Sequence, residues 1–197
     1  MFMDWVALLL VNMAAGYMLL AAFVFRALDN SAHRNWAPGF GMVGLIALVF
    51  GGIIATTWPL PGPFNSMYGD MSVFFGLIFL GAAVAMARGW SLMSVTVYAF
   101  FAGAAAMVIG AAVLRLGLTP KPFLTGVGFV LSGLGGVMAA PTYRFARRNL
   151  YFRTAAAAVL ALTALLWLAN GLPAYWMHLT LDSFGKWVPL AMRAAGK

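Results

Sequence analysis

The sequence predicts an all-α bundle that crosses a lipid bilayer about six times. Of its 197 residues, 64% are hydrophobic and only 8% are charged, and the mean hydropathy is +0.94. Because an average soluble domain is about 25% charged, this composition excludes an ordinary soluble enzyme and a disordered chain. The apolar runs do not alternate with polar residues as membrane β-strands do, and helices satisfy every backbone group internally, as lipid requires.

Six apolar stretches account for the expected spans. A hydrocarbon core about 30 Å thick requires roughly 20 apolar residues in a helix. The stretches cover residues 5–25, 39–58, 71–87, 92–114, 123–140 and 154–168. The last stretch can continue past Asn170, Gly171 and Pro173 as far as residue 181. We therefore expect a six-helix transmembrane domain over residues 1–182 and an interfacial C-terminal tail over residues 183–197.

The basic residues predict the orientation, because cytoplasmic loops carry an excess of Lys and Arg. The loops after the first, third and fifth spans contain Arg26, Arg34, Arg88, Arg144, Arg147, Arg148 and Arg153. The opposite side contains Arg115 and Lys121, and the tail adds three more basic residues. We expect a multi-pass protein of the cell (inner) membrane with both termini outside, an orientation that reverses if the tail counts fully.

Small residues spaced by four recur in three spans. This spacing puts them on one face of each helix, where they allow a neighbouring helix to pack closely. These sets are Ala47, Gly51 and Ala55; Ala102, Ala106 and Gly110; and Gly128, Ser132 and Gly136. Packing within the bundle and a seam between subunits both explain them.

The segment between the second and third spans is the most informative. Pro59, Pro61 and Pro63 stop a helix, and the turn residues Asn65, Ser66 and Gly69 follow. Asp70 comes directly before the third apolar run. Its carboxylate is expected either to cap that helix or to bind a cation or a partner's base at the membrane edge.

The run Asn65-Ser66-Met67-Tyr68-Gly69-Asp70, followed by Phe74-Phe75-Gly76, resembles the domain of unknown function DUF981. That family has an Asn-x-x-Phe-Gly-Glu-Pro-like motif after a Pro-rich stretch, and here Tyr68, Asp70 and Met71 depart from it. The resemblance implies a small integral membrane protein of about six spans, and it implies no catalytic residue.

A polar site is predicted near the outer face. Asn12 and Asn170 lie in apolar spans, toward the leaflet that also contains Asn65, Tyr68 and Asp70. An Asn in a bilayer usually bonds a neighbouring helix. The alternative is that Asn12 and Asn170 line a small polar cavity close to Asp70.

The segment 141–153 interleaves arginines with aromatic residues. In a soluble protein such a pattern is typical of nucleic-acid binding, but beside a membrane it predicts an interfacial segment that binds anionic lipid headgroups. The expected ligands of those headgroups are Arg144, Arg147, Arg148 and Arg153. Docking of a soluble acidic partner is the alternative, and no nucleic acid is expected.

Three functions remain open. No ionisable residue lies clearly at mid-membrane, which argues against an ion-coupled carrier, and the sequence indicates no catalytic set, no metal site and no particular cofactor. The leading interpretation is an accessory subunit of a larger membrane complex, which packs against other subunits or itself and binds lipid or quinone. The alternatives are a small channel or facilitator for an uncharged or anionic solute, and a membrane enzyme that uses Asp70 and Tyr68.

Overall fold

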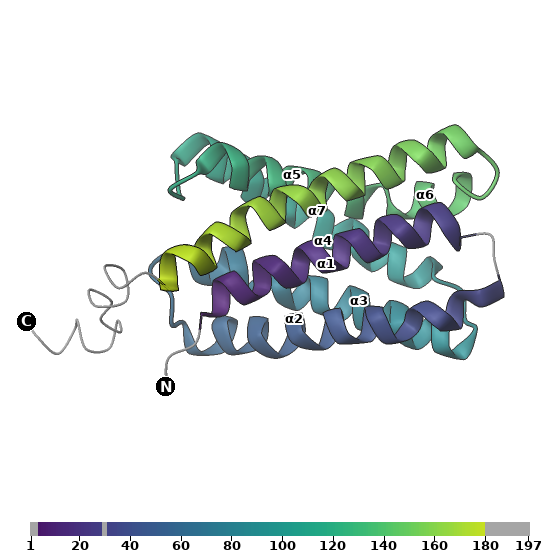
Figure 1. The fold of residues 1–197 in the computed structure, drawn as a ribbon, viewed down its shortest axis with the longest axis horizontal. Coiled ribbons are helices and arrows are strands. Elements are labelled where there is room, and N and C mark those ends of the chain that lie inside the picture. The colour runs from purple at the N-terminus through teal and green to yellow at the C-terminus, as the bar shows by residue number, and fades with distance from the viewer. Residues whose placement is uncertain (1–3, 29–30, 180–197) are drawn as a thin grey trace, which may run out of the picture.

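A computed structural model describes residues 4–28 and 31–179, and within these ranges all regular structure is helical. Seven α-helices run along one elongated bundle (Figure 1). They are α1 (Trp5–Arg26), α2 (Ala37–Thr57), α3 (Met71–Arg88), α4 (Met93–Leu116), α5 (Pro122–Val137), α6 (Ala139–Phe145) and α7 (Leu150–Leu179). A 3₁₀ helix, η1 (Ser31–Trp36), precedes α2, and a π-helical segment, η2 (Asn65–Asp70), precedes α3. The all-α prediction is confirmed.

Local chemistry sets the ends of these helices. Asp4 caps α1, because its Oδ1 accepts a hydrogen bond from the Ala7 N–H at 3.2 Å. Helix α5 begins at Pro122, whose missing N–H would have no partner in the first turn. Helices α3 and α4 end at Gly89 and Gly117, which adopt the left-handed conformation at φ 71° and 63°.

The helices reproduce the expected spans with one difference. Among the described residues, five helices are long and apolar enough to cross a membrane, and a sixth span forms if α5 and α6 are taken together. The axes of α5 and α6 differ by 52°, so the stretch expected over residues 123–140 is a broken span rather than one straight helix. Helix α7 continues through Pro173 to Leu179, the longer of the two extents that the sequence allowed. The protein is therefore a multi-pass membrane protein embedded in lipid.

Three antiparallel helix pairs make up the bundle: α1 with α7, α2 with α3, and α4 with α5. Glycines seven residues apart line the seams of the last two pairs. A Cβ on Gly44 would lie 3.0 Å from the Gly76 carbonyl oxygen, and one on Gly110 would lie 2.9 Å from that of Gly126. In a bilayer the hydrophobic effect does not bring helices together, so close packing of the two backbones stabilises each pair instead.

The sets of small residues spaced by four are covered within the chain. Gly51 contacts Ser72 and Gly69, and Gly128 faces the Trp167 ring. Gly136 approaches the Ala99 carbonyl oxygen. Packing within the bundle therefore explains these faces, and none of them remains as a free seam for another subunit.

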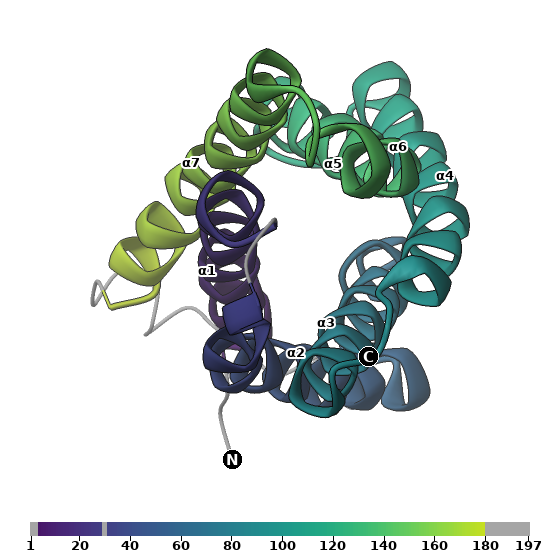
Figure 2. The ribbon, with the colours of Figure 1, turned by 90° about the vertical axis from the view of Figure 1, so that its right-hand side faces the viewer.

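Contacts between the three pairs are sparser than contacts within them. Seen end-on, the helices form a ring (Figure 2). The α2–α3 and α4–α5 connections lie at one end of the bundle, and the α3–α4 and α6–α7 connections lie at the other (Figure 1). Residues 59–70 and the arginine-rich segment 144–153 thus lie at opposite ends. The predicted tail lies outside the described residues.

Candidate functional site

Two adjoining cavities lie inside the ring of helices. The narrow cavity has a volume of about 150 Å³ and is lined by α1, α3, α4 and α5, with single residues from α2 and α6. The wide cavity has a volume of about 330 Å³ and lies toward the arginine-rich end, between α1, α5, α6 and α7. Both cavities include Leu20, Phe23, Leu92, Thr96, Gly135 and Ala139 in their walls. The two cavities therefore share part of their walls inside the bundle.

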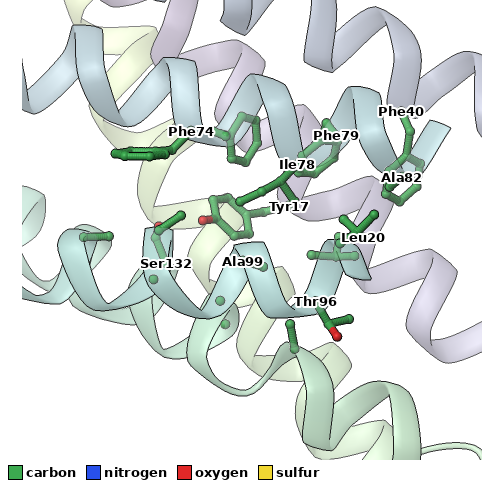
Figure 3. A pocket seen from close by; sticks show the side chains of 18 of the residues that line it. Tyr17, Leu20, Phe40, Phe74, Ile78, Phe79, Ala82, Thr96, Ala99 and Ser132 are labelled. Carbon is green, nitrogen blue, oxygen red and sulfur yellow. The ribbon is translucent and has the colours of Figure 1, made fainter. Parts of the chain in front are cut away.

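The walls of the narrow cavity differ from side to side (Figure 3). Helix α3 contributes an aromatic face that includes Phe74, Phe75 and Phe79, while α4 and α5 contribute mainly small residues such as Ala99 and Gly136. None of the described residues that line either cavity is Asp, Glu, Lys, Arg or His. An apolar cavity of about 150 Å³ stays dry and accepts a molecule as large as benzene.

Three hydroxyl groups interrupt the apolar wall: those of Tyr17, Thr96 and Ser132. The Thr96 hydroxyl donates to the Met93 carbonyl oxygen at 2.7 Å, so its proton is already used. The Tyr17 hydroxyl points toward Ser132 (Figure 3) and is within hydrogen-bonding reach of its side chain.

Behind Ser132, the Trp167 Nε1–H donates a hydrogen bond of 2.9 Å to the Ser132 Oγ. Trp167 is fully buried, and its ring packs edge-to-face on Phe129 at a centroid distance of 5.0 Å. Tyr17, Ser132 and Trp167 come from α1, α5 and α7, so tertiary packing alone brings them together.

The two intramembrane asparagines do not line these cavities. The Asn12 Nδ2 donates to the Val43 carbonyl oxygen on α2 at 2.9 Å. The Asn170 Nδ2 donates to the Leu166 carbonyl oxygen at 3.0 Å, and its Oδ1 accepts from Thr125 at 3.4 Å. Each amide bonds its own neighbours, which is the helix-bonding interpretation rather than the shared polar cavity.

The loop residues have separate environments. Asn65 is completely buried and bonds the backbone of Leu60 through both its amide and carbonyl groups, and it also donates to the Gly62 carbonyl oxygen at 3.1 Å. Tyr68 packs on Phe129, a residue of the narrow cavity's wall, at 6.2 Å between centroids. Tyr68 therefore lies behind the wall of the narrow cavity without being one of its lining residues.

Asp70 does not cap α3, contrary to one of the two expectations for it. Its backbone is helical, and its side chain makes no capping hydrogen bond. The reason is that η2 runs directly into α3. The first N–H groups of α3 therefore follow a preceding helical turn that can supply carbonyl acceptors, and they need no side-chain cap.

One of the four predicted lipid-binding arginines has an internal role. The Arg147 Nε donates to the Leu28 carbonyl oxygen at 3.0 Å, and its guanidinium lies 4.7 Å from the centroid of the Tyr143 ring. It thereby joins the α6–α7 connection to the end of α1. Arg144 and Arg148 are exposed at the same end of the bundle, and Arg153 is half-buried there.

Sequence reasoning did not single out the central residues. Ser132 stood out only as one of the small residues spaced by four, Tyr17 is a polar residue within an apolar span, and Trp167 is one of many apolar residues of the last span. One available signal was the position of Trp167: it lies deep inside its span, whereas Trp58, Trp90 and Trp176 are exposed near helix ends.

A search of curated proteins found no match to this chain. The fold is similar to the cryo-EM structure of the Helicobacter pylori urea channel in its closed state, with a TM-score of 0.67 and 15% sequence identity, over 92% of this chain and 99% of that one. At this identity the likeness establishes the fold alone. A family model described as a protein of unknown function (DUF981) matches residues 1–181, and the chain belongs to this family.

Proposed function

We propose that this protein is a channel that lets small uncharged solutes pass along the axis of the helix bundle. The observation that carries the proposal is a pair of cavities inside the bundle that share lining residues and whose described walls contain no Asp, Glu, Lys, Arg or His. An ion would lose its hydration there without compensation, at a cost of tens of kcal/mol for an isolated charge in a medium of low dielectric constant. A neutral solute of a few heavy atoms loses far less.

The fold supports the same solute class. The similar structure is that of a urea channel, and urea is a small neutral molecule. This comparison favours the channel interpretation over the accessory-subunit interpretation and over an enzyme that uses Asp70. It also favours an uncharged solute over the anionic solute that the sequence left open.

The narrow cavity is the expected barrier of the path. Its walls are aromatic on α3 and apolar elsewhere, apart from the three hydroxyl groups. Hydrophobic constrictions of this kind exclude ions because water does not fill them.

Flux into vesicles tests the proposal. Purified protein is reconstituted into liposomes, and the entry of urea, acetamide and sodium ions is measured by stopped-flow light scattering and a sodium-sensitive dye. We expect faster entry of both neutral solutes than in protein-free liposomes, with no increase for sodium. Equal neutral-solute entry with and without folded protein would contradict the proposal.

A matched pair of variants locates the path. Ala102 lines the narrow cavity, whereas Ala104 is exposed on the same helix. Ala102→Leu is expected to slow neutral-solute entry, because the larger side chain fills the cavity. Ala104→Leu faces away from the cavity and is expected to keep the wild-type rate.

Location and partners complete the proposal. We infer that the arginine-rich end faces the cytoplasm of a cell (inner) membrane, which places both termini outside. Anionic lipid headgroups are the expected partners of Arg144, Arg148 and Arg153 at that end. Association with further copies or with other membrane subunits would use faces other than the small-residue seams, because those are filled within the chain.

A further inference from the structure

We propose that the hydroxyl groups of Tyr17 and Ser132, here called the hydroxyl pair, bind the acceptor oxygen of the solute inside the narrow cavity, and that Trp167 positions Ser132 for this contact. The proposal deepens the channel function and rests on it. It identifies which atoms of the path distinguish one neutral solute from another.

The hydroxyl pair remains when the three hydroxyl groups in the wall of the narrow cavity are considered in turn. Side-chain hydroxyls line the narrow cavity at Tyr17, Thr96 and Ser132. Thr96 donates its proton to the backbone of its own helix at 2.7 Å. The pair therefore supplies the remaining side-chain hydroxyls in the wall of the narrow cavity, and these two are hydrogen-bonding neighbours of each other.

Trp167 determines how Ser132 presents its proton. An indole N–H can only donate, so the Ser132 Oγ accepts at 2.9 Å and one of its lone pairs is occupied. The hydroxyl proton of Ser132 is left to point elsewhere, and the Tyr17 hydroxyl is its hydrogen-bonding neighbour in the cavity wall (Figure 3). Trp167 itself is fully buried and does not line the cavity.

The pair recognises a particular chemistry. A polar solute that enters an apolar cavity loses its hydrogen bonds to water and pays for any that are not replaced. Two neighbouring hydroxyl groups that can turn from each other toward a solute replace such bonds at an acceptor oxygen, such as that of a carbonyl group. Sulfur accepts hydrogen bonds weakly, so a thiocarbonyl of nearly the same shape gains less.

Acetamide and thioacetamide provide the test. The entry rate of each into liposomes is measured, the rate in protein-free liposomes is subtracted, and the ratio of the two is compared between variants. Ser132→Ala and Tyr17→Phe are each expected to lower the acetamide-to-thioacetamide ratio by about threefold to tenfold, the effect of one hydrogen bond. Tyr17→Phe keeps the ring that packs on Phe75, so it tests the pair with the packing retained.

Two controls separate recognition from general damage. Ser72→Ala removes a buried hydroxyl that does not line either cavity, and Thr96→Val removes a lining hydroxyl whose proton is already used. Both are expected to keep the wild-type ratio. Each variant must elute as the wild-type protein does in size-exclusion chromatography.

A double variant tests the positioning role of Trp167. Trp167→Phe retains an aromatic ring against Phe129 and removes the indole donor, so it should lower the ratio in the same direction as Ser132→Ala. The Ser132→Ala/Trp167→Phe double variant should match Ser132→Ala alone, because Trp167 acts through the missing hydroxyl. Additive losses would show that Trp167 has only a packing role.

The outcomes separate this proposal from the channel function. If the wild-type protein conducts neither neutral solute, the channel function is wrong and the hydroxyl pair has no solute to bind. If acetamide passes but Ser132→Ala and Tyr17→Phe leave the ratio unchanged, the channel stands and the hydroxyl pair is overturned as its binding site.

Discussion

Gly103 on α4 and Gly133 on α5 bring their two backbones into direct contact. A Cβ placed on Gly103 would lie 2.5 Å from the Gly133 carbonyl oxygen, and one on Gly133 would lie 2.6 Å from that of Gly103. The contact is reciprocal, so the two helices approach as closely as their main chains allow. A Cβ on Gly133 would also meet the Met107 Cγ, but a backbone oxygen obstructs each of the two positions, so side-chain rotation alone cannot relieve a substitution at either.

Gly103→Ala is therefore expected to lower the free energy of unfolding by about 1–3 kcal/mol, the usual cost of forcing an extra carbon into a packed interior. Thermal unfolding in mild detergent would measure it. Gly52→Ala is the matched control, since a Cβ on Gly52 of α2 meets nothing within 4 Å. The control should be neutral or slightly stabilising, because Ala favours helix over Gly. Equal losses in both variants would contradict the seam described for α4 and α5.

Asn65 holds the proline-rich turn by its bonds to the backbone of Leu60 and Gly62. Asn65→Ala removes these bonds and leaves backbone groups of the turn without their partner, at an expected cost of about 1–3 kcal/mol. Limited proteolysis should then cut more readily near residues 59–64, and the unfolding temperature should fall.

Asp70→Asn provides the contrasting case within the same motif. Because the Asp70 side chain makes no capping hydrogen bond, its replacement should leave the unfolding temperature of the protein unchanged. A loss approaching the roughly 1 kcal/mol typical of a helix cap would show that the carboxylate does cap α3.

Asp4 joins the start of α1 to the end of α7. Its Oδ1 caps α1, and its Oδ2 pairs with the Nδ1 of His178. Asp4→Asn keeps an N-cap side chain and should cost less than Asp4→Ala, for which about 1 kcal/mol is expected. His178 is 48% exposed, so His178→Ala should cost at most about 1 kcal/mol. Thermal unfolding of the three variants measures the order, and a larger loss for His178→Ala than for Asp4→Ala would contradict it.

The arginines of segment 144–153 should separate into two groups. Arg148→Gln is expected to weaken stabilisation by phosphatidylglycerol while leaving the protein as stable as wild type in neutral detergent, since a basic residue near an anionic surface contributes about 1 kcal/mol. Arg147→Gln should also lower stability in neutral detergent, because Arg147 bonds Leu28 and stacks on Tyr143. Unfolding temperatures with phosphatidylglycerol or phosphatidylcholine measure both. Arg115→Gln, at the other end of the bundle, is the control.

Much of the candidate site could not be predicted, and the reason differs from residue to residue. Asn12 and Asn170 stood out because an amide is conspicuous in an apolar span, yet both bond nearby backbone and neither lines the cavities. Trp167 did not stand out, because an indole counts as an apolar residue in a hydropathy pattern. Its N–H becomes informative only when the packing of α7 on α5 places it against Ser132.

The small residues illustrate the same limit. Their abundance predicted close packing, but the spacing by four did not identify the seams. In the α2–α3 and α4–α5 pairs the contacts recur every seven residues, at Gly44 and Gly51 and at Gly103 and Gly110. Spacing by four and spacing by seven both place residues on about the same helix face, so only the partner helix shows which residues touch.

The amino-acid sequence alone determined that the chain lies in a lipid bilayer, that it is helical and which segments span the bilayer. Hydropathy and run length are local properties, so each segment's preference for lipid can be judged separately. It also indicated the family. Tertiary structure alone decided that α5 and α6 form a broken span, that the helices associate as three pairs, and that two cavities without charged side chains among their described lining residues lie between those pairs. Lipid does not drive helices together as water does, so their arrangement depends on which surfaces fit, and that complementarity is a property of two helices rather than of either sequence segment.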